Sequence, residues 1–248
     1  SSIDVGGAGI YDSGEMRISR QELQLLTSVN ANFTAPKGNV TVYETIYNDT
    51  FTIQERINFN AFSTIRFANT SVFKSTYSGA RSILIDADVK VADDDLTFDA
   101  QTYHVSAGAY IVSEAKNIHV KASQYTNSFM FVGTPVVWRS ASHLVFDIPI
   151  NVSGSDMLSL HADYDEDADG TILLSSRSHV RVVSEVQTIM LTAADVEISS
   201  QIVALGANVT IQTSNQTHSV MSVGGNYGGL HLSDDELDRI ETQTALTL

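Results

Sequence analysis

The sequence predicts an all-β fold: a parallel β-helix or similar solenoid from a tandem array, with β-sandwich domains as the alternative. Apolar and polar residues alternate along most of the chain, which is the period of a strand with one buried face. Clear examples are residues 40–43, 83–91, 144–148 and 209–211. No apolar pattern at i, i+3, i+4, i+7 lasts three turns, so long helices are not expected.

The spacing of the strands favours the solenoid over the sandwich. Tight hairpins are marked by Asn-Gly or Asp-Gly pairs, and the chain has only Asp169-Gly170. Strand starts that lie 20 to 26 residues apart would mark successive coils. Two such series are Leu96, Ile118 and Leu144, and Ile189, Val209 and Leu230.

Composition excludes several classes of protein. The 248 residues fit one large domain or two small ones, and 14 Lys and Arg against 29 Asp and Glu give a net charge of −15. This sign repels nucleic acid and anionic lipid. The lack of cysteine excludes disulfides, a thiol nucleophile, thiolate zinc sites and iron–sulfur clusters. No apolar run is long enough to cross a bilayer, and no membrane insertion is expected. The start at Ser1, without a signal-peptide pattern, is expected of a mature chain or an excised fragment.

The two ends of the chain carry the same short pattern. Val5-Gly6-Gly7 and Val223-Gly224-Gly225 are each followed by a Ser-x-x-Glu-Leu motif, at residues 19–23 and 233–237. In such a motif the Ser hydroxyl caps a helical turn and the Glu reaches back to the Ser amide, which is a capping box. The chain is therefore divided into a first copy (1–35), a β-rich body (36–220) and a second copy that starts the next unit (221–248).

A unit that ends as it began leaves open sheet edges at both ends. Such edges are covered by another copy of the unit, and head-to-tail contacts that do not close produce filaments. We therefore expect the chain's main partner to be itself, in an end-to-end homopolymer.

Several segments also resemble the repeats of filamentous-haemagglutinin-like large tandem-repeat β-helix surface proteins. They are residues 158–173, 188–202, 206–211 and 230–240, and the similarity extends over 144–248. The resemblance implies a secreted right-handed β-helix at the cell surface, with a role in adhesion or fibre architecture and no catalytic residues. The chain departs from the family pattern in having few corner glycines and in the many aromatic residues of 36–80, which leaves the fold of the first half open.

Seven Asn-x-Ser/Thr sequons predict N-linked glycans and a secretory route. They are Asn32, Asn39, Asn48, Asn69, Asn151, Asn208 and Asn215.

An acidic run supplies the one candidate metal site. Asp165, Asp167 and Asp169 stand before Gly170 as in the first half of a calcium loop, but position 12 of that loop is Ser176 instead of a bidentate Glu. A solvated acidic turn is favoured and calcium is the alternative. No other cofactor is expected. Residues 93–95, three consecutive Asp, are expected to form a turn between two strands.

No motif predicts an enzyme. The seven histidines have no metal-binding spacing, no G-x-S-x-G marks a nucleophile, and no basic trio accompanies the acidic clusters. The preferred function is an extracellular structural or adhesive glycoprotein unit of a filament. The alternative is a carbohydrate-binding adhesin module, and the least favoured reading is a polysaccharide-acting β-helix enzyme. Aromatic residues that could stack on sugars are expected mostly in the core; they are Tyr43, Tyr47, Phe51, Phe59, Phe62, Phe67, Phe73 and Trp138.

Overall fold

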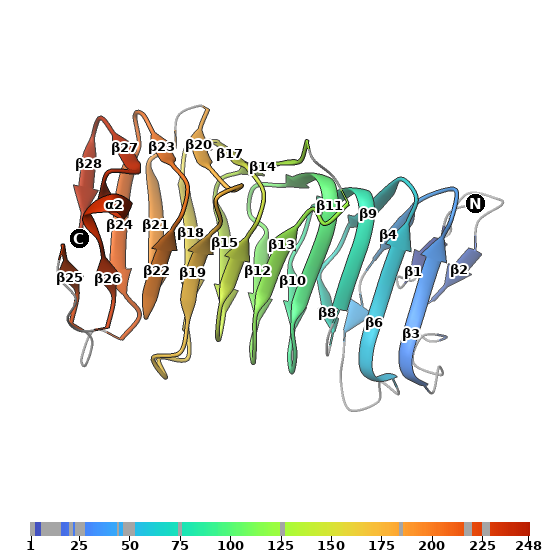
Figure 1. Cartoon of the computed structure of the whole chain (residues 1–248). Helices are drawn as coiled ribbons and strands as arrows, with labels where there is room; N and C mark the ends of the chain where they lie inside the picture. Colours follow the sequence, from blue (N-terminus) through green and yellow to red (C-terminus); the bar gives the residue numbers. More distant parts are fainter. Residues whose placement is uncertain are drawn as a thin grey trace.

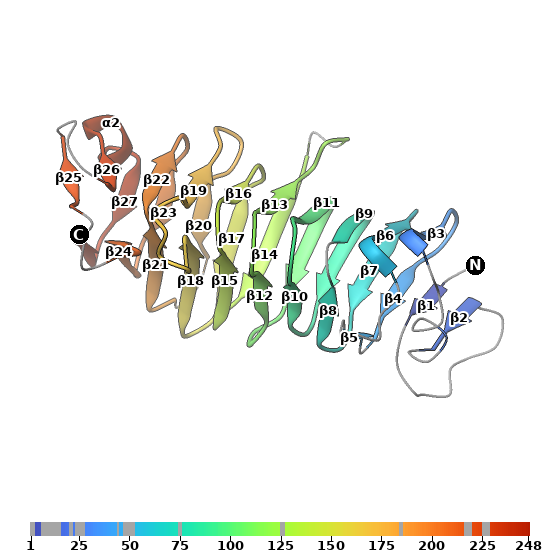
Figure 2. The ribbon, with the colours of Figure 1, turned by 90° about the horizontal axis from the view of Figure 1, so that it is seen from below.

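The computed structural model shows a parallel β-helix, which confirms the predicted fold class. It describes residues 3–5, 16–19, 22, 28–43, 45–46, 53–73, 76–124, 127–183, 186–215, 220–224 and 229–248. Every strand pair in these ranges is parallel, and the strands stack along one axis with the two termini at opposite ends (Figure 1). Figure 2 shows the same stack from below, with the strands again side by side along its length.

The strands form three faces. Face one contains β3 (Ser28–Ala35), β6 (Ile53–Ala61), the first halves of β9 (Thr76–Ile85) and β11 (Leu96–Val105), β13 (Ile118–Lys121), β16 (Leu144–Phe146), β19 (Thr171–Leu174) and β22 (Asp195–Ile198). Face two contains β2 (Met16–Ile18), β1 (Ile3–Val5), β4 (Val40–Val42), β7 (Thr64–Phe67), the second halves of β9 and β11, β14 (Phe129–Gly133), β17 (Ile150–Ser153), β20 (Val180–Val182), β23 (Ile202–Ala204) and β27 (Ile240–Thr242). Face three contains β5 (Thr45–Ile46), β8 (Ser71–Phe73), β10 (Val89–Val91), β12 (Tyr110–Ser113), β15 (Val136–Ser140), β18 (Met157–Ala162), β21 (Thr188–Ala193), β24 (Asn208–Thr213) and β28 (Ala245–Thr247).

Faces one and two are hydrogen-bonded into one sheet because β9 and β11 bend through the corner between them. The first half of β9 pairs with β6, and its second half pairs with β7. Near the C-terminal end, β25 (Ser222–Val223), β26 (His231–Leu232) and the single turn α2 (Asp234–Leu237) are inserted before β27. None of the helices in the described part of the chain is long and apolar enough to cross a membrane.

Side chains of the same register position stack into columns inside the coil. Because alternate residues of a strand point inward, each column receives one apolar side chain from each coil. One column of face one contains Phe33, Phe59, Ser78, Phe98, Val120, Phe146, Leu174 and Ile198, all buried. The ring of Trp138, from face three, meets those of Phe98 and Phe146 edge-on at 6.3 and 5.4 Å between centroids. These columns form the core, and most of the burial that stabilises the fold lies in them.

The predicted coil spacing is confirmed for the first series and is partly wrong for the second. Leu96 pairs with Ile118, and Ile118 with Leu144, one coil apart each time. Ile189 likewise pairs with Val209, but the partner of Val209 in the next coil is Leu246 and not Leu230. The excursion through β25, β26 and α2 delays the return of the chain to face three.

The aromatic residues behave mostly as expected. Phe59, Phe67, Phe73 and Trp138 are buried in the core. Phe62 is the exception, because 69% of it is exposed at the corner after β6. Tyr43 is half-buried, and Tyr47 and Phe51 lie outside the described residues.

The three predicted segments are joined by strand pairing. In the described part of the chain, β3 of segment 1–35 pairs with β6 of the body, and β24 of the body pairs with β28 of segment 221–248.

Candidate functional site

The C-terminal end of the coil exposes residues that belong to the core columns. Leu246 on β28 pairs in register with Val209 on β24, so that it occupies an inward position. Val209 is fully buried, whereas Leu246 is 37% exposed, since no described strand pairs with the outer edge of β28. Leu248, Val223 and Val220 are exposed at the same end. The apolar interior therefore reaches the surface at this end.

The N-terminal end has a similar exposed position. Ile3 on β1 pairs with Val40 of β4 on one side and with Met16 of β2 on the other. Val40 and Ile3 are buried, but Met16, at the end of this column, is 60% exposed. Among the described strands, β2 has a partner on one edge only. An inward apolar position and a free strand edge are thus found at both ends.

The capping boxes of both copies are present with the same hydrogen bonds. In the first, the Ser19 hydroxyl accepts from the Glu22 amide (3.2 Å) and the Glu22 carboxylate accepts from the Ser19 amide (2.9 Å). In the second, the corresponding distances between Ser233 and Glu236 are 3.3 and 2.9 Å. Both predicted boxes are therefore formed.

The strand pair before each box is also repeated. Val5 pairs with Ile18 before Ser19, and Val223 pairs with Leu232 before Ser233. The two copies differ in what they stack on: β1 of the first copy lies on β4 in face two, whereas β26 of the second contacts β22 in face one. The local unit is the same but its place in the coil is not.

The acidic run forms a loop between β18 and β19 that is closed by its own hydrogen bonds. Asp163 is fully buried and has a positive φ of 57°. Its carboxylate accepts from the Ala168 amide (3.0 Å) and from the hydroxyl of Ser214, which arrives from the end of β24. A Cβ on Gly170 would lie 2.2 Å from the amide nitrogen of Asp163, so only glycine fits there. The side chain of Asp163 thus links the loop to the coil of β24, two coils further along the stack.

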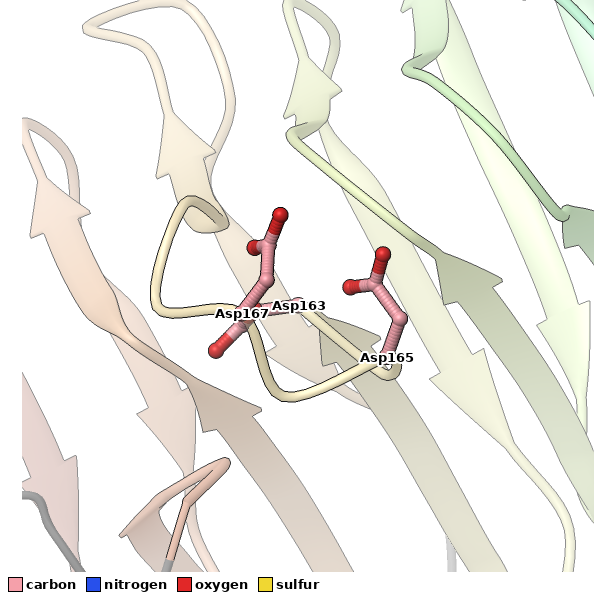
Figure 3. Close-up of side chains that lie close together, drawn as sticks. All are labelled: Asp163, Asp165 and Asp167. Carbon is pink, nitrogen blue, oxygen red and sulfur yellow. The ribbon is translucent and has the colours of Figure 1, made fainter.

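The carboxylates that meet are not the predicted set. Oxygens of Asp163, Asp165 and Asp167 lie within 4.8 Å of one another, and Asp169 is outside this group. Figure 3 shows Asp165 and Asp167 projecting to the same side of the loop. Sequence reasoning missed Asp163 as a member of the group, although it directly follows a strand in the same alternating run. Three clustered carboxylate oxygens are the ligand type that calcium prefers.

Electrostatics disfavours the ionised form of this group. Burial raises the pKa of Asp163, and the neighbouring Asp167 raises it further, while the hydrogen bonds from Ser214 and Ala168 act in the opposite direction. Burial and the charge of Asp167 also raise the pKa of Asp165. Burial first, and then like charges held close together, account for the raised pKa of both residues.

The predicted sequons lie on the outer wall wherever the structure describes them. Asn32, Asn39 and Asn69 are exposed, and Asn151, Asn208 and Asn215 are half-buried. Asn48 lies outside the described residues.

The amide nitrogen to which a glycan would attach differs among these residues. Asn39 accepts through Oδ1 from the Thr64 amide (3.2 Å), and Asn32 accepts through Oδ1 from the Asn58 side chain (2.8 Å). Neither uses its Nδ2 in a hydrogen bond to the described residues. Asn215 instead donates through Nδ2 to the carbonyl of Glu166 (3.3 Å).

Two other groups of ionisable residues are explained by their structural surroundings. Asp93–Asp95 lie between β10 and β11, as predicted, and Asp94 forms an ion pair with Lys116 of the next coil at 2.8 Å. Burial and the charge of Arg139 lower the pKa of His161 to about 4, so that its imidazole is neutral at pH 7.

Comparison with known proteins identifies no relative of this chain. No family model matches the chain, no curated protein matches it, and no solved structure matches its fold.

Proposed function

We propose that the chain is an extracellular structural glycoprotein unit that assembles end to end into a filament or surface fibre. The observation that carries the proposal is the exposure of core columns at both ends, at Met16 and Leu246. Stacking of another copy on β28 would bury Leu246 in the manner of Val209. Completing the burial of such a side chain contributes about 0.5–1 kcal/mol, a fraction of the value for burying a whole leucine.

Backbone hydrogen bonds support the same assembly. An exposed strand edge presents unpaired N–H and C=O groups, which are a template for another strand. In the described part of the chain β27 and β28 each have one partner, β23 and β24. A second unit in register with both would extend two faces at once. Because the two ends of a unit differ, the contact is head-to-tail and continues without closing.

The outer wall fits the extracellular part of the proposal. Asn69 is exposed between β7 and β8, away from the C-terminal edge strands and from β3, the N-terminal edge strand that contains Asn32, so a glycan on Asn69 leaves the head-to-tail contact free. The role is structural and not catalytic: glycoside hydrolysis needs two carboxylates on either side of the bond. Among the described residues, Asp99 is the only acid that lines the cleft over β3, β6, β9 and β11, and the two acids that line the cleft beside Lys116, Asp93 and Asp94, are consecutive in the sequence.

Electron microscopy and sedimentation velocity of the purified chain over a range of concentrations test the proposal. We expect fibres that lengthen with concentration. Face three has nine strands, which at a spacing of about 4.8 Å predict an axial repeat of about 43 Å. A single monomeric species at the highest concentration would contradict the proposal.

A further inference from the structure

A cleft of about 660 Å³ lies on the outer wall at the corner between faces one and two, over β3, β6, β9 and β11. Its floor contains the outward positions Asn60, Gly79 and Asp99, which pair in register on three successive coils. The middle position has no side chain. A Cβ on Gly79 would lie 3.0 Å from Cε1 of Tyr77 and 3.3 Å from Oδ1 of Asn60. The glycine therefore gives the ring of Tyr77 the space to lie across the floor.

Two groups in the floor are held in fixed positions. Asp99 is 8% exposed; its Oδ1 accepts from the Ser123 amide at 2.8 Å, and its Oδ2 accepts from the Tyr77 hydroxyl at 3.4 Å. Burial, with the charge of Asp99, raises the pKa of Tyr77, so the phenol remains a protonated donor. The buried carboxylate and the phenol thus form a rigid polar floor beneath an aromatic face.

An exposed aromatic ring lies at the rim of the cleft. Phe62 is 69% exposed, more than any other large apolar residue in the described chain. Its backbone is fixed, because the Phe62 amide donates to the carbonyl of Ala35 at 2.9 Å. Ala61, the residue before it, is only partly buried against the core, and the ring of Phe62 lies outside the core. Aromatic faces exposed beside polar groups are suited to binding amphipathic ligands.

The cleft also holds a cation without a protein partner. Arg81 is exposed on β9 at the corner, and it has no hydrogen bond or ion pair to the described residues. Several other cations pair with an acid of a nearby coil, as Arg66 does with Asp86 at 2.6 Å. A free guanidinium presents a planar pair of donors that matches a carboxylate.

We propose that this cleft binds an oligosaccharide that carries uronic-acid carboxylates. The C–H face of a pyranose ring packs on Phe62 or Tyr77, and the side-chain amides of Asn60, Gln101 and Gln124 hydrogen-bond its hydroxyl groups. Arg81 binds the carboxylate of a uronate ring. The cleft is open, and its lining is about equally polar and apolar, which fits a hydrated chain with C–H faces and hydroxyl groups better than a wholly apolar small molecule.

This site is independent of end-to-end assembly, because the cleft lies on the side wall. The binding test is therefore made on the wild-type chain and on Leu246→Glu, which is designed to block assembly. A wild-type chain that binds the saccharide but does not assemble would contradict the proposed function alone, and a wild-type chain that assembles but does not bind would contradict the cleft alone. Leu246→Glu should bind the saccharide as the wild type does.

The experiment is titration calorimetry with tetrasaccharides of galacturonate, glucuronate, mannuronate and guluronate, and with neutral tetrasaccharides of the parent hexoses. We expect saturable binding of at least one uronate. Arg81→Gln and Phe62→Ala should each weaken it about tenfold, the usual effect of losing one good contact. Arg181→Gln, a matched change on the exposed side of β20, should leave it unaltered.

Gly79→Ala provides a second check on the geometry, because it displaces the Tyr77 ring without changing any charge. We expect it to weaken uronate binding while the circular dichroism spectrum stays that of the wild type. The proposal is overturned if no uronate binds, if neutral tetrasaccharides bind equally well, or if Arg181→Gln has the same effect as Arg81→Gln.

Discussion

Leu246 pairs in register with Val209, yet Val209 is fully buried and Leu246 is 37% exposed. The two residues occupy the same inward column of face three, one coil apart. The difference between them is the absence of a further described coil beyond β28, and it leaves an apolar surface at the end of the core.

Leu246→Glu should therefore reduce assembly. A charge at an inward position would have to be buried when the next unit stacks, which costs several kcal/mol unless it is paired. We expect fibre length and sedimentation coefficient to fall sharply. Thr247→Glu is the matched control, since it adds the same charge at the next, outward position of β28. Equal effects of the two variants would show that charge, and not inward burial, controls assembly.

Removal of the second capping box should destabilise the C-terminal end. Ser233→Ala should lower the free energy of unfolding by about 1 kcal/mol in urea denaturation at neutral pH. Ser19→Ala should have a smaller effect, because Glu22 is exposed whereas Glu236 is half-buried and also accepts from the Ile198 amide at 3.1 Å. A larger loss for Ser19→Ala would contradict this ranking.

The loss of stability in Ser233→Ala should depend on pH, because it involves the carboxylate of Glu236. Burial opposes its ionisation, but hydrogen bonds from Ser233 and Ile198 outweigh burial and lower the pKa of Glu236. The unfolded state then binds protons more readily than the native state, so stability is present above the ordinary glutamate pKa and declines as the pH falls through the lowered value. We expect the difference between wild type and Ser233→Ala to shrink in acid. A difference that grows in acid would contradict this assignment.

Asp163 should have the opposite effect on the pH dependence of stability. Because burial and Asp167 raise the pKa of Asp163, the native state holds a proton that the unfolded state has lost. Its contribution to stability is present below the ordinary aspartate pKa, about 3.9, and is lost as the pH rises through the raised native value. Asp163→Asn, which keeps an acceptor for the Ala168 amide and tolerates a positive φ, should remove this decline. Urea denaturation of both proteins at a series of pH values would measure this decline. If Asp163→Asn showed the same dependence of stability on pH as the wild type, the decline would not come from Asp163.

Chelation should have little effect on the fold. The loop of Asp163, Asp165 and Asp167 is held by hydrogen bonds from Ala168 and Ser214, and these form without a metal ion. We expect the melting temperature and fibre formation to be the same in EGTA and in calcium. A rise of the melting temperature in calcium that disappears in Asp167→Asn would instead identify a calcium site.

Glycan occupancy should follow the availability of the asparagine side-chain nitrogen. Asn39 keeps its Nδ2 free while Oδ1 accepts from Thr64, whereas Asn215 uses its Nδ2 to bond the carbonyl of Glu166. Mass spectrometry of the chain secreted from eukaryotic cells should find glycan on Asn39 and little or none on Asn215. The reverse order would show that native-state contacts do not govern occupancy here.

The coil was predictable from the sequence because strand alternation has a short, local period. The sequence alone indicates three successive coils, which begin at Leu96, Ile118 and Leu144. A four-residue motif indicates the two capping boxes, at Ser19 and Ser233. Leu230 was wrongly predicted to begin the coil after Val209. The excursion through β25, β26 and α2 adds residues to this coil, and the alternation of apolar and polar residues around Leu230 does not reveal the addition.

The candidate sites were harder to predict because they depend on register between coils. The group around Asp163 depends on positive φ angles in its loop and on Ser214, which lies 51 residues away. In the same way, Tyr77 and Asp99 come from different coils, and only the pairing of β9 with β11 brings them together. The spacing of these residues along the sequence reveals neither the contact of Asp163 with Ser214 nor that of Tyr77 with Asp99.

Interior columns that receive one side chain from each coil make stability a nearest-neighbour property. The terminal coils have a neighbour on one side only, so thermal fraying should begin at the tips of a fibre and proceed inward coil by coil. Units in the middle would be protected from proteases by their flanking copies, and growth, breakage and repair of such a fibre would all be events of its two extremities.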